Sequence, residues 1–223
     1  MRRIHYHKTS PTTHQRLKRR TVDTPMKASA TAWAGDVARW YDSLVGAKGS
    51  EYQQELVLPG VLRLLDLKKG ERLLDLACGR GRHVRLLLER GHKVVALDRD
   101  AEALAGLGTP PSLEVVAADL EDGSPWPLGA RRFGGIVVTN YLHRPLFPAL
   151  VAALAPGGLL IYETFARGNE RFGRPRNPDH LLNQSELLEV VRPDCTVLAY
   201  EALEVGEPAP AVIQRVCARR HGS

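Results

Sequence analysis

The chain has 223 residues, of which 43% are apolar and 25% charged, with a net charge of +6; this is the composition of an ordinary globular protein. No apolar run approaches the roughly 18–20 residues that a membrane-spanning helix needs, and the cysteines (Cys78, Cys195 and Cys217) form no C-x-x-C pair. These features argue against a membrane protein, a disulfide framework and a cysteine-based zinc site, and they predict a cytoplasmic protein.

The positive charge lies at the N-terminus. Residues 1–27 hold eight Lys or Arg and one acid, so the remaining 196 residues sum to −1. We therefore expect residues 1–30 to be a basic, disordered extension and residues 31–223 to form one domain. The extension has three interpretations: a segment without a specific role, an electrostatic arm for RNA or another polyanion, or an Arg-rich targeting peptide. Contact with nucleic acid is expected only through this extension.

The rest of the chain alternates between predicted strands and helices. Helical spacing covers 33–45 and 51–67, and is followed by strand 72–77, helix 82–90, strand 93–98, helix 100–106, and strands 113–117 and 133–139. A helix at 146–154, a turn at 156–158 and a strand at 159–164 come next. Residues 166–183 are irregular, and helix 185–191, with Ser185 as its N-cap, precedes strands 195–204 and 211–218. This order predicts an α/β fold whose last two strands pair antiparallel.

The most informative segment is residues 73–81, Leu-Leu-Asp-Leu-Ala-Cys-Gly-Arg-Gly. A strand, a tight glycine turn and a helix let the backbone approach a ligand where the helix N-terminus exposes its N–H groups. Asp98 ends the second strand about 20 residues further on, where an acid usually accepts hydrogen bonds from ribose hydroxyls. The sequence therefore predicts a cofactor that contains a nucleoside.

Two cofactor classes compete for this turn. A dinucleotide site requires G-x-G-x-x-G or a final Ala, so that a pyrophosphate fits against a closely packed helix. Here Gly79 and Gly81 are followed by Val84, so the third small residue is missing. The alternative pattern has an acid in the first strand followed by a G-x-G-x-G-like turn, and Asp75 with Ala77, Gly79 and Gly81 fits it.

This second pattern resembles motif I of the class I S-adenosylmethionine-dependent methyltransferases. The resemblance continues with Asp98 and with Ala117-Ala118-Asp119-Leu120 after the third strand, and it covers about residues 33–219. The residue pattern of the chain, especially Ala77-Cys78-Gly79-Arg80-Gly81-Arg82-His83, is similar to that of small bacterial-type members of this family, including tellurite- and thiopurine-type enzymes. The resemblance implies a Rossmann-like three-layer sandwich with a seven-stranded, mostly parallel sheet and one antiparallel edge strand.

The resemblance also implies S-adenosyl-L-methionine as the cofactor. Asp75 would lie near its amino acid part, Gly79 and Gly81 near its methionine and ribose, and Asp98 at its ribose hydroxyls. Asp119 would accept a hydrogen bond from the adenine amine, and Leu120 would pack on the ring. The complete predicted cofactor set is Asp75, Ala77, Gly79, Gly81, Asp98, Arg99, Asp119, Leu120 and Asn140.

Residues 139–145 follow the fourth strand, where the family places residues that face the methyl acceptor. This loop lacks the two prolines of the adenine N6-methyltransferase signature, which argues against methylation of that base. His143 is the candidate general base because its pKa is ordinarily near neutrality, and Tyr141 is a second candidate. No acid cluster has metal-ligand spacing, so no metal is expected. Four arginines in 166–183 suggest an anionic acceptor: Arg167, Arg171, Arg174 and Arg176.

The predicted function is methyl transfer to a small-molecule acceptor by a monomer or homodimer. One alternative is an RNA or protein methyltransferase that uses the basic extension. The other is a domain that binds a nucleoside cofactor without catalysis, or an oxidoreductase.

Overall fold

The computed structural model describes residues 71–206 and 210–222. The basic extension and the helices predicted over 33–45 and 51–67 lie outside these residues. Within the described ranges, no helix has both the length and the apolar character needed to cross a membrane.

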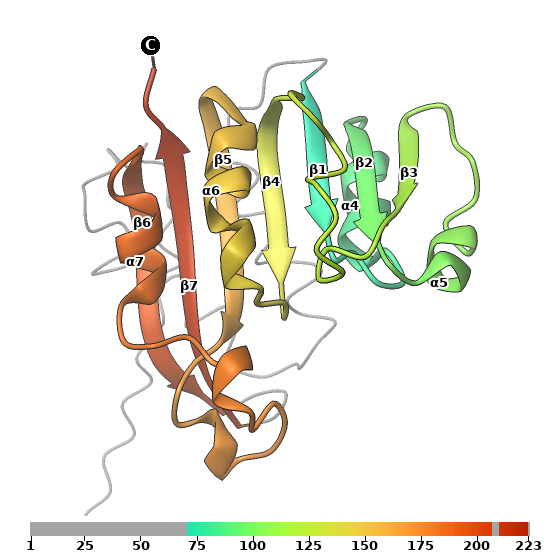
Figure 1. Cartoon of the computed structure of the whole chain (residues 1–223). Coiled ribbons are helices and arrows are strands. Elements are labelled where there is room, and N and C mark those ends of the chain that lie inside the picture. The colour runs from blue at the N-terminus through green and yellow to red at the C-terminus, as the bar shows by residue number, and fades with distance from the viewer. Residues whose placement is uncertain (1–70, 207–209, 223) are drawn as a thin grey trace, which may run out of the picture.

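Seven strands form one sheet in the order β3-β2-β1-β4-β5-β7-β6 across the described part of the chain (Figure 1). Strand β7 runs antiparallel to both β5 and β6, and the other neighbours pair in parallel. The predicted mostly parallel sheet with an antiparallel pair at its edge is confirmed. The strands are β1 (Arg72–Leu76), β2 (Lys93–Asp98), β3 (Leu113–Ala117), β4 (Phe133–Thr139), β5 (Leu154–Phe165), β6 (Cys195–Val205) and β7 (Ala211–Arg220).

Helices cover both faces of the sheet, which gives the predicted three layers. The apolar side chains of β1 alternate: Leu73 belongs to the same core cluster as Val84 of α4, and Leu74 to the same cluster as Phe147 of α6 and Leu187 of α7. Figure 1 looks onto the face that α6 and α7 cover, with α4 behind the sheet. The helices are α4 (Arg82–Glu89), α5 (Ala101–Ala105), α6 (Phe147–Ala153) and α7 (Glu186–Val191).

One local prediction was wrong, and another was confirmed only in part. Strand β5 begins at Leu154 rather than at residue 159, because its pairing with β4 jumps from Phe133–Leu154 to Gly135–Leu159. The predicted turn at 156–158 lies inside this irregularity. Ser185 is the N-cap residue of α7, as predicted, but its side chain makes no capping hydrogen bond, and its backbone is left-handed, with φ 57°.

The segment 166–183 is irregular, as predicted, but it is closed at its base. The Arg167 N–H donates to the Leu182 carbonyl over 3.0 Å, and the Leu182 N–H donates to the Phe165 carbonyl over 3.0 Å. Two short 3₁₀ helices lie between these bonds, η3 (Asn169–Arg171) and η4 (Pro178–His180). The segment is thus a compact loop attached to the carboxyl end of β5.

The glycine turn between β1 and α4 is left-handed at two glycines, Gly79 with φ 52° and Gly81 with φ 74°. A Cβ at Gly79 would meet no atom within 4 Å, but one at Gly81 would lie 2.1 Å from Cδ2 of Leu107. Gly81 therefore serves the close packing of the start of α4 against the chain that follows α5.

Gly81→Ala is expected to lower the free energy of unfolding by about 2 kcal/mol and Gly79→Ala by about 1 kcal/mol. Both alanines would be strained at a positive φ, but only the one at 81 forces Leu107 to move. Urea unfolding followed by circular dichroism measures both values. Equal losses in the two variants would contradict the packing role of Gly81.

Candidate active site at the carboxyl edge of the sheet

A pocket of about 370 Å³ lies where the carboxyl ends of the central strands meet. Open α/β sheets bind ligands at this edge. The segments after five parallel strands line it, together with two residues of the loop 166–183. The described residues that line the pocket are Ala77, Leu97, Asp98, Arg99, Ala118, Asp119, Leu120, Glu121, Asn140, Tyr141, Leu142, Thr164, Phe165, Pro175 and His180.

At one end of the pocket, Asp98 connects β2 to the glycine turn. Its Oδ2 accepts a hydrogen bond from the Gly79 N–H over 2.7 Å, and its Oδ1 accepts one from the Asp100 N–H over 2.9 Å. The N-cap of α5 is Asp100, whose side chain accepts from the Ala103 N–H, so Asp98 is not used for capping. Each carboxylate oxygen of Asp98 keeps a further lone pair, which a hydroxyl of a ligand can use.

Next to Asp98, the segment after β3 supplies a polar and an apolar group to the pocket. The Oδ1 atom of Asp119 accepts from the Glu121 N–H over 2.9 Å, and its Oδ2 lies 3.9 Å from the Arg99 guanidinium. Leu120 packs against the main core while still lining the pocket. This pairing of a carboxylate with an aliphatic side chain suits a flat, polar-edged ring.

Three residues of the predicted cofactor set do not line the pocket: Asp75, Gly79 and Gly81. Asp75 is 1% exposed, and its Oδ1 lies 3.8 Å from Nδ1 of the buried His83. Its Oδ2 has no hydrogen-bond partner among the described residues. A buried carboxylate oxygen without a donor is costly, so a donor supplied by a ligand would relieve that cost.

At the other end of the pocket, the residues after β4 and β5 form a largely apolar wall of Tyr141, Leu142, Phe165 and Pro175. Asn140 also lines the pocket, with a left-handed backbone at φ 55°, and its N–H donates to the Glu163 carbonyl. The structure thereby brings Asn140 and Tyr141 into the same pocket as Asp98.

The two predicted catalytic side chains are placed differently. His143 is half-buried before the 3₁₀ helix η2 (Arg144–Leu146) and is not among the residues that line the pocket. Tyr141 lines the pocket, but burial and the nearby Glu121 carboxylate, which accepts its hydrogen bond, raise the pKa of the Tyr141 phenol. Tyr141 therefore stays protonated at neutral pH, where it can donate a hydrogen bond but is not a base.

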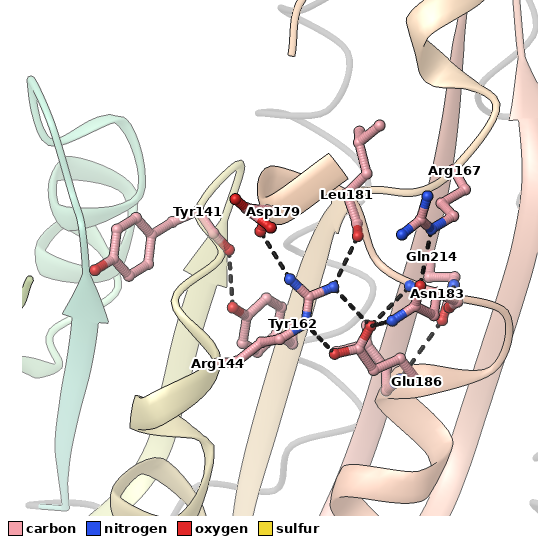
Figure 2. Close-up of polar contacts among 10 residues, drawn as sticks. Tyr141, Arg144, Tyr162, Arg167, Asp179, Leu181, Asn183, Glu186 and Gln214 are labelled. Carbon is pink, nitrogen blue, oxygen red and sulfur yellow. Dashed lines mark hydrogen bonds and ion pairs between the residues drawn. The ribbon is translucent and has the colours of Figure 1, made fainter. Parts of the chain in front are cut away.

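Arg144 ties the segment after β4 to the loop 166–183 (Figure 2). Its Nε and Nη2 atoms donate to the two carboxylate oxygens of Glu186, over 2.6 and 2.9 Å. It also donates to the carbonyl oxygens of Asp179 over 2.7 Å and Leu181 over 2.8 Å. Arg144 is thus a fixed structural group and is not available to bind a substrate anion.

The four arginines of the loop do not form an anion site in the described structure, since none of them lines the pocket. Arg167 donates to the Asn183 side chain, and Arg176 donates to the Gly173 carbonyl. Arg171 pairs with Glu204, and its guanidinium carbon lies 5.0 Å from the centre of the Phe172 ring. Among the described residues, these arginines therefore give no support to the predicted anionic acceptor, which stays a prediction.

The charges that line the pocket favour a cationic ligand. The described residues that line the pocket include three carboxylates (Asp98, Asp119 and Glu121) and one guanidinium, that of Arg99. Such a field opposes a pyrophosphate and attracts a positive charge. The described residues also contain no group of three or more His, Cys, Asp or Glu side chains that could hold a metal ion.

Sequence reasoning missed Glu121 and His180 as pocket residues. Glu121 lies directly beyond the recognised Asp119–Leu120 pair, so extending that motif by one residue would have found it. His180 carries no local signal, because the folding of the loop 166–183 alone brings it to the pocket.

The chain is similar in sequence to known methyltransferases and similar in fold to solved structures. A family model described as a methyltransferase domain matches residues 50–191, more than half of the chain. Residues of this chain are 35% identical over 83 positions to a dTDP-3-amino-3,6-dideoxy-alpha-D-glucopyranose N,N-dimethyltransferase of Streptomyces fradiae, covering 35% of this chain and 32% of that protein. Ribosomal RNA small subunit methyltransferase H of Anaeromyxobacter sp. (strain K) is 46% identical over 57 residues, which are 25% of this chain and 18% of the relative.

The matched segments thus span a third or less of these two curated relatives. Among solved structures, an S-adenosylmethionine dependent methyltransferase from Mesorhizobium loti superposes with a TM-score of 0.58 at 21% identity. That superposition covers 73% of this chain and 96% of the other. At this identity the likeness supports the fold alone.

Proposed function

Because this chain belongs to a methyltransferase-domain family and has the fold of an S-adenosylmethionine dependent methyltransferase, we propose that it methylates a small-molecule acceptor held at the β4–β5 end of the pocket. The observation that carries this proposal is the continuity of the pocket. One cavity of about 370 Å³ runs from Asp98 to the apolar wall around Phe165. A cofactor held by its adenosine at the first end can thus meet a compact acceptor at the second.

The described residues fit S-adenosyl-L-methionine. In this proposal, Asp98 holds the ribose hydroxyls, and Asp119 and Leu120 hold the adenine. Asp75, whose buried Oδ2 has no hydrogen-bond partner among the described residues, would accept a hydrogen bond from the amino acid part of the cofactor. When bound, the cofactor supplies a methyl group that its sulfonium charge has already activated. The protein has to align the acceptor with this methyl group and exclude water.

The walls of the acceptor end indicate the kind of molecule that fits there. Tyr141, Leu142, Phe165 and Pro175 present apolar surface, and no described Lys or Arg lines this end. We therefore propose an uncharged acceptor in place of an anionic one. The relative named for a dTDP-linked amino sugar is, by its name, also a small-molecule methyltransferase; it supports the size of the proposed acceptor but not its lack of charge, because dTDP carries a diphosphate.

The test is a methyl-transfer assay with labelled S-adenosylmethionine and a library of small metabolites. We expect transfer to one or a few uncharged members, with S-adenosylhomocysteine as a product inhibitor. Transfer to RNA or protein fractions, with no small acceptor found, would contradict the proposal.

A second candidate function is methylation of RNA, in which the basic extension captures the substrate. The net charge of +7 over residues 1–27 and the similarity to a ribosomal RNA methyltransferase favour it. Deletion of residues 1–25 separates the two candidates in the same assay. If the acceptor is a small molecule, its methylation should be unchanged by the deletion. If the acceptor is RNA, RNA binding and RNA methylation should be lost.

A further inference from the structure

The loop 166–183 places one imidazole, that of His180, at the acceptor end of the pocket. His180 ends η4, and its exposed side chain is in reach of bulk water as well as of the pocket. Among the described residues that line the pocket, it is the sole histidine. We propose that His180 takes the proton of the methyl acceptor, an inference that rests on the proposed function. The acceptor is then an uncharged ring compound with a weakly acidic hydroxyl.

The backbone around His180 is held on both sides. Arg144 donates to the carbonyl oxygens of Asp179 and Leu181, the residues that flank it. Asn177 is the N-cap of η4, and its Oδ1 accepts a hydrogen bond from the Asp179 N–H over 3.1 Å. Arg144 is itself fixed by its two bonds to Glu186, as Figure 2 shows. A general base needs such positioning, because proton transfer requires a short and well-aligned hydrogen bond.

The other candidate bases near this end are less suitable. Tyr141 is protonated at neutral pH, and His143 does not line the pocket. An imidazole, with an ordinary pKa of about 6.5, can take a proton from a phenol of pKa about 10, whereas an aliphatic alcohol is a far weaker acid. The ring of Phe165 and the apolar side chains of Leu142 and Pro175 suit a flat acceptor of this kind.

The hydroxyl oxygen of the acceptor forms the new bond to the methyl carbon, and the carbon–sulfur bond breaks with its electron pair left on sulfur. The hydroxyl proton moves to a ring nitrogen of His180. Because His180 is exposed, the imidazolium can then release this proton to solvent.

Other charged and titratable groups lie near His180 and would also influence how the proposed proton transfer depends on pH. Asp179 belongs to η4 itself, and Arg144, on the segment after β4, donates to its carbonyl oxygen. The remaining titratable groups that line the pocket, among the described residues, are Asp98, Arg99, Asp119, Glu121 and Tyr141.

The test uses the full chain saturated with S-adenosylhomocysteine and 4-nitrophenol as the probe, whose phenolate form absorbs visible light. In the wild type, a nearby imidazolium should make bound 4-nitrophenol ionise roughly one pH unit lower than in His180→Gln. His143→Gln should behave as the wild type, because it removes an imidazole outside the pocket. His92→Gln, at the opposite end of β2, is the matched control.

Three results would overturn the inference: ionisation that is the same in the wild type and His180→Gln, a shift lost in His143→Gln instead, or no binding of the probe at millimolar concentration. Failure of the proposed function is seen separately, in the methyl-transfer assay: transfer to RNA or protein fractions, with no small acceptor found, would contradict that function whatever the 4-nitrophenol titration shows.

Discussion

Asp98→Asn is expected to weaken binding of S-adenosylhomocysteine by roughly 1.5–3 kcal/mol, about 10- to 150-fold. Asn keeps the size of the side chain but removes the charge, and only one of its two terminal atoms accepts hydrogen bonds. The substitution acts in two ways, because Asp98 also accepts the Gly79 N–H over 2.7 Å and so holds the glycine turn in place. Isothermal titration calorimetry measures the loss directly.

The matched control is Asp100→Asn, which changes the same charge two residues away. Asp100 caps α5 and does not line the pocket, and Asn is an equally good N-cap. Its affinity for S-adenosylhomocysteine should therefore stay within twofold of the wild type. Equal losses in the two variants would mean that the charge acts at long range and that Asp98 does not contact the ligand.

Arg144→Met is expected to lower the free energy of unfolding by about 3 kcal/mol, because it removes charged hydrogen bonds and leaves the Glu186 carboxylate largely buried without its main partner. The carbonyl oxygens of Asp179 and Leu181 lose the same donor. Urea unfolding measures the stability, and hydrogen exchange should show faster exchange over 177–182.

Arg171→Met provides the control within the same loop. Its ion pair with Glu204 is exposed, with 60% and 54% of the two side chains accessible, and such pairs contribute only about 0–1 kcal/mol. If Arg171→Met were as destabilising as Arg144→Met, the special role of the Arg144–Glu186 pair would be refuted.

The Arg144–Glu186 pair also has a pH signature. Burial raises the pKa of Glu186, but the hydrogen bonds from Arg144 and from the Asn183 N–H outweigh it and leave the pKa below its ordinary value of 4.5. A carboxyl with a lowered pKa in the folded state stabilises the fold above its ordinary pKa, and this stability is lost as the pH falls through the lower value. The wild type should therefore lose stability below about pH 4.5 more steeply than Arg144→Met.

The features that could be predicted from the sequence are those set by short-range patterns. Apolar runs located β1, β2 and β4 to within a residue, because buried parallel strands are nearly continuous apolar segments. The carboxyl ends of β2, β3 and β4 then placed Asp98, Asp119 and Asn140 at one edge of the sheet, where they do share a pocket. The roles assigned to these residues toward the cofactor stay predictions.

The features that were missed depend on contacts between distant segments. Nothing near His180 in the sequence marks it, since its position depends on Arg144, some 36 residues earlier. Ser185 is the N-cap residue of α7 but makes no capping bond with its side chain, while the adjacent Glu186 is held by Arg144 and accepts the Asn183 N–H over 2.7 Å. The early start of β5 likewise arises from its pairing with β4, which no local pattern encodes.

The most direct test of the account is a parallel calorimetric titration of the full chain with S-adenosylhomocysteine and with NADH. The acidic lining of the pocket and the missing third small residue after the glycine turn predict one saturable site for S-adenosylhomocysteine and no measurable heat of binding for NADH. Binding of NADH, with S-adenosylhomocysteine unable to compete for the site, would contradict it.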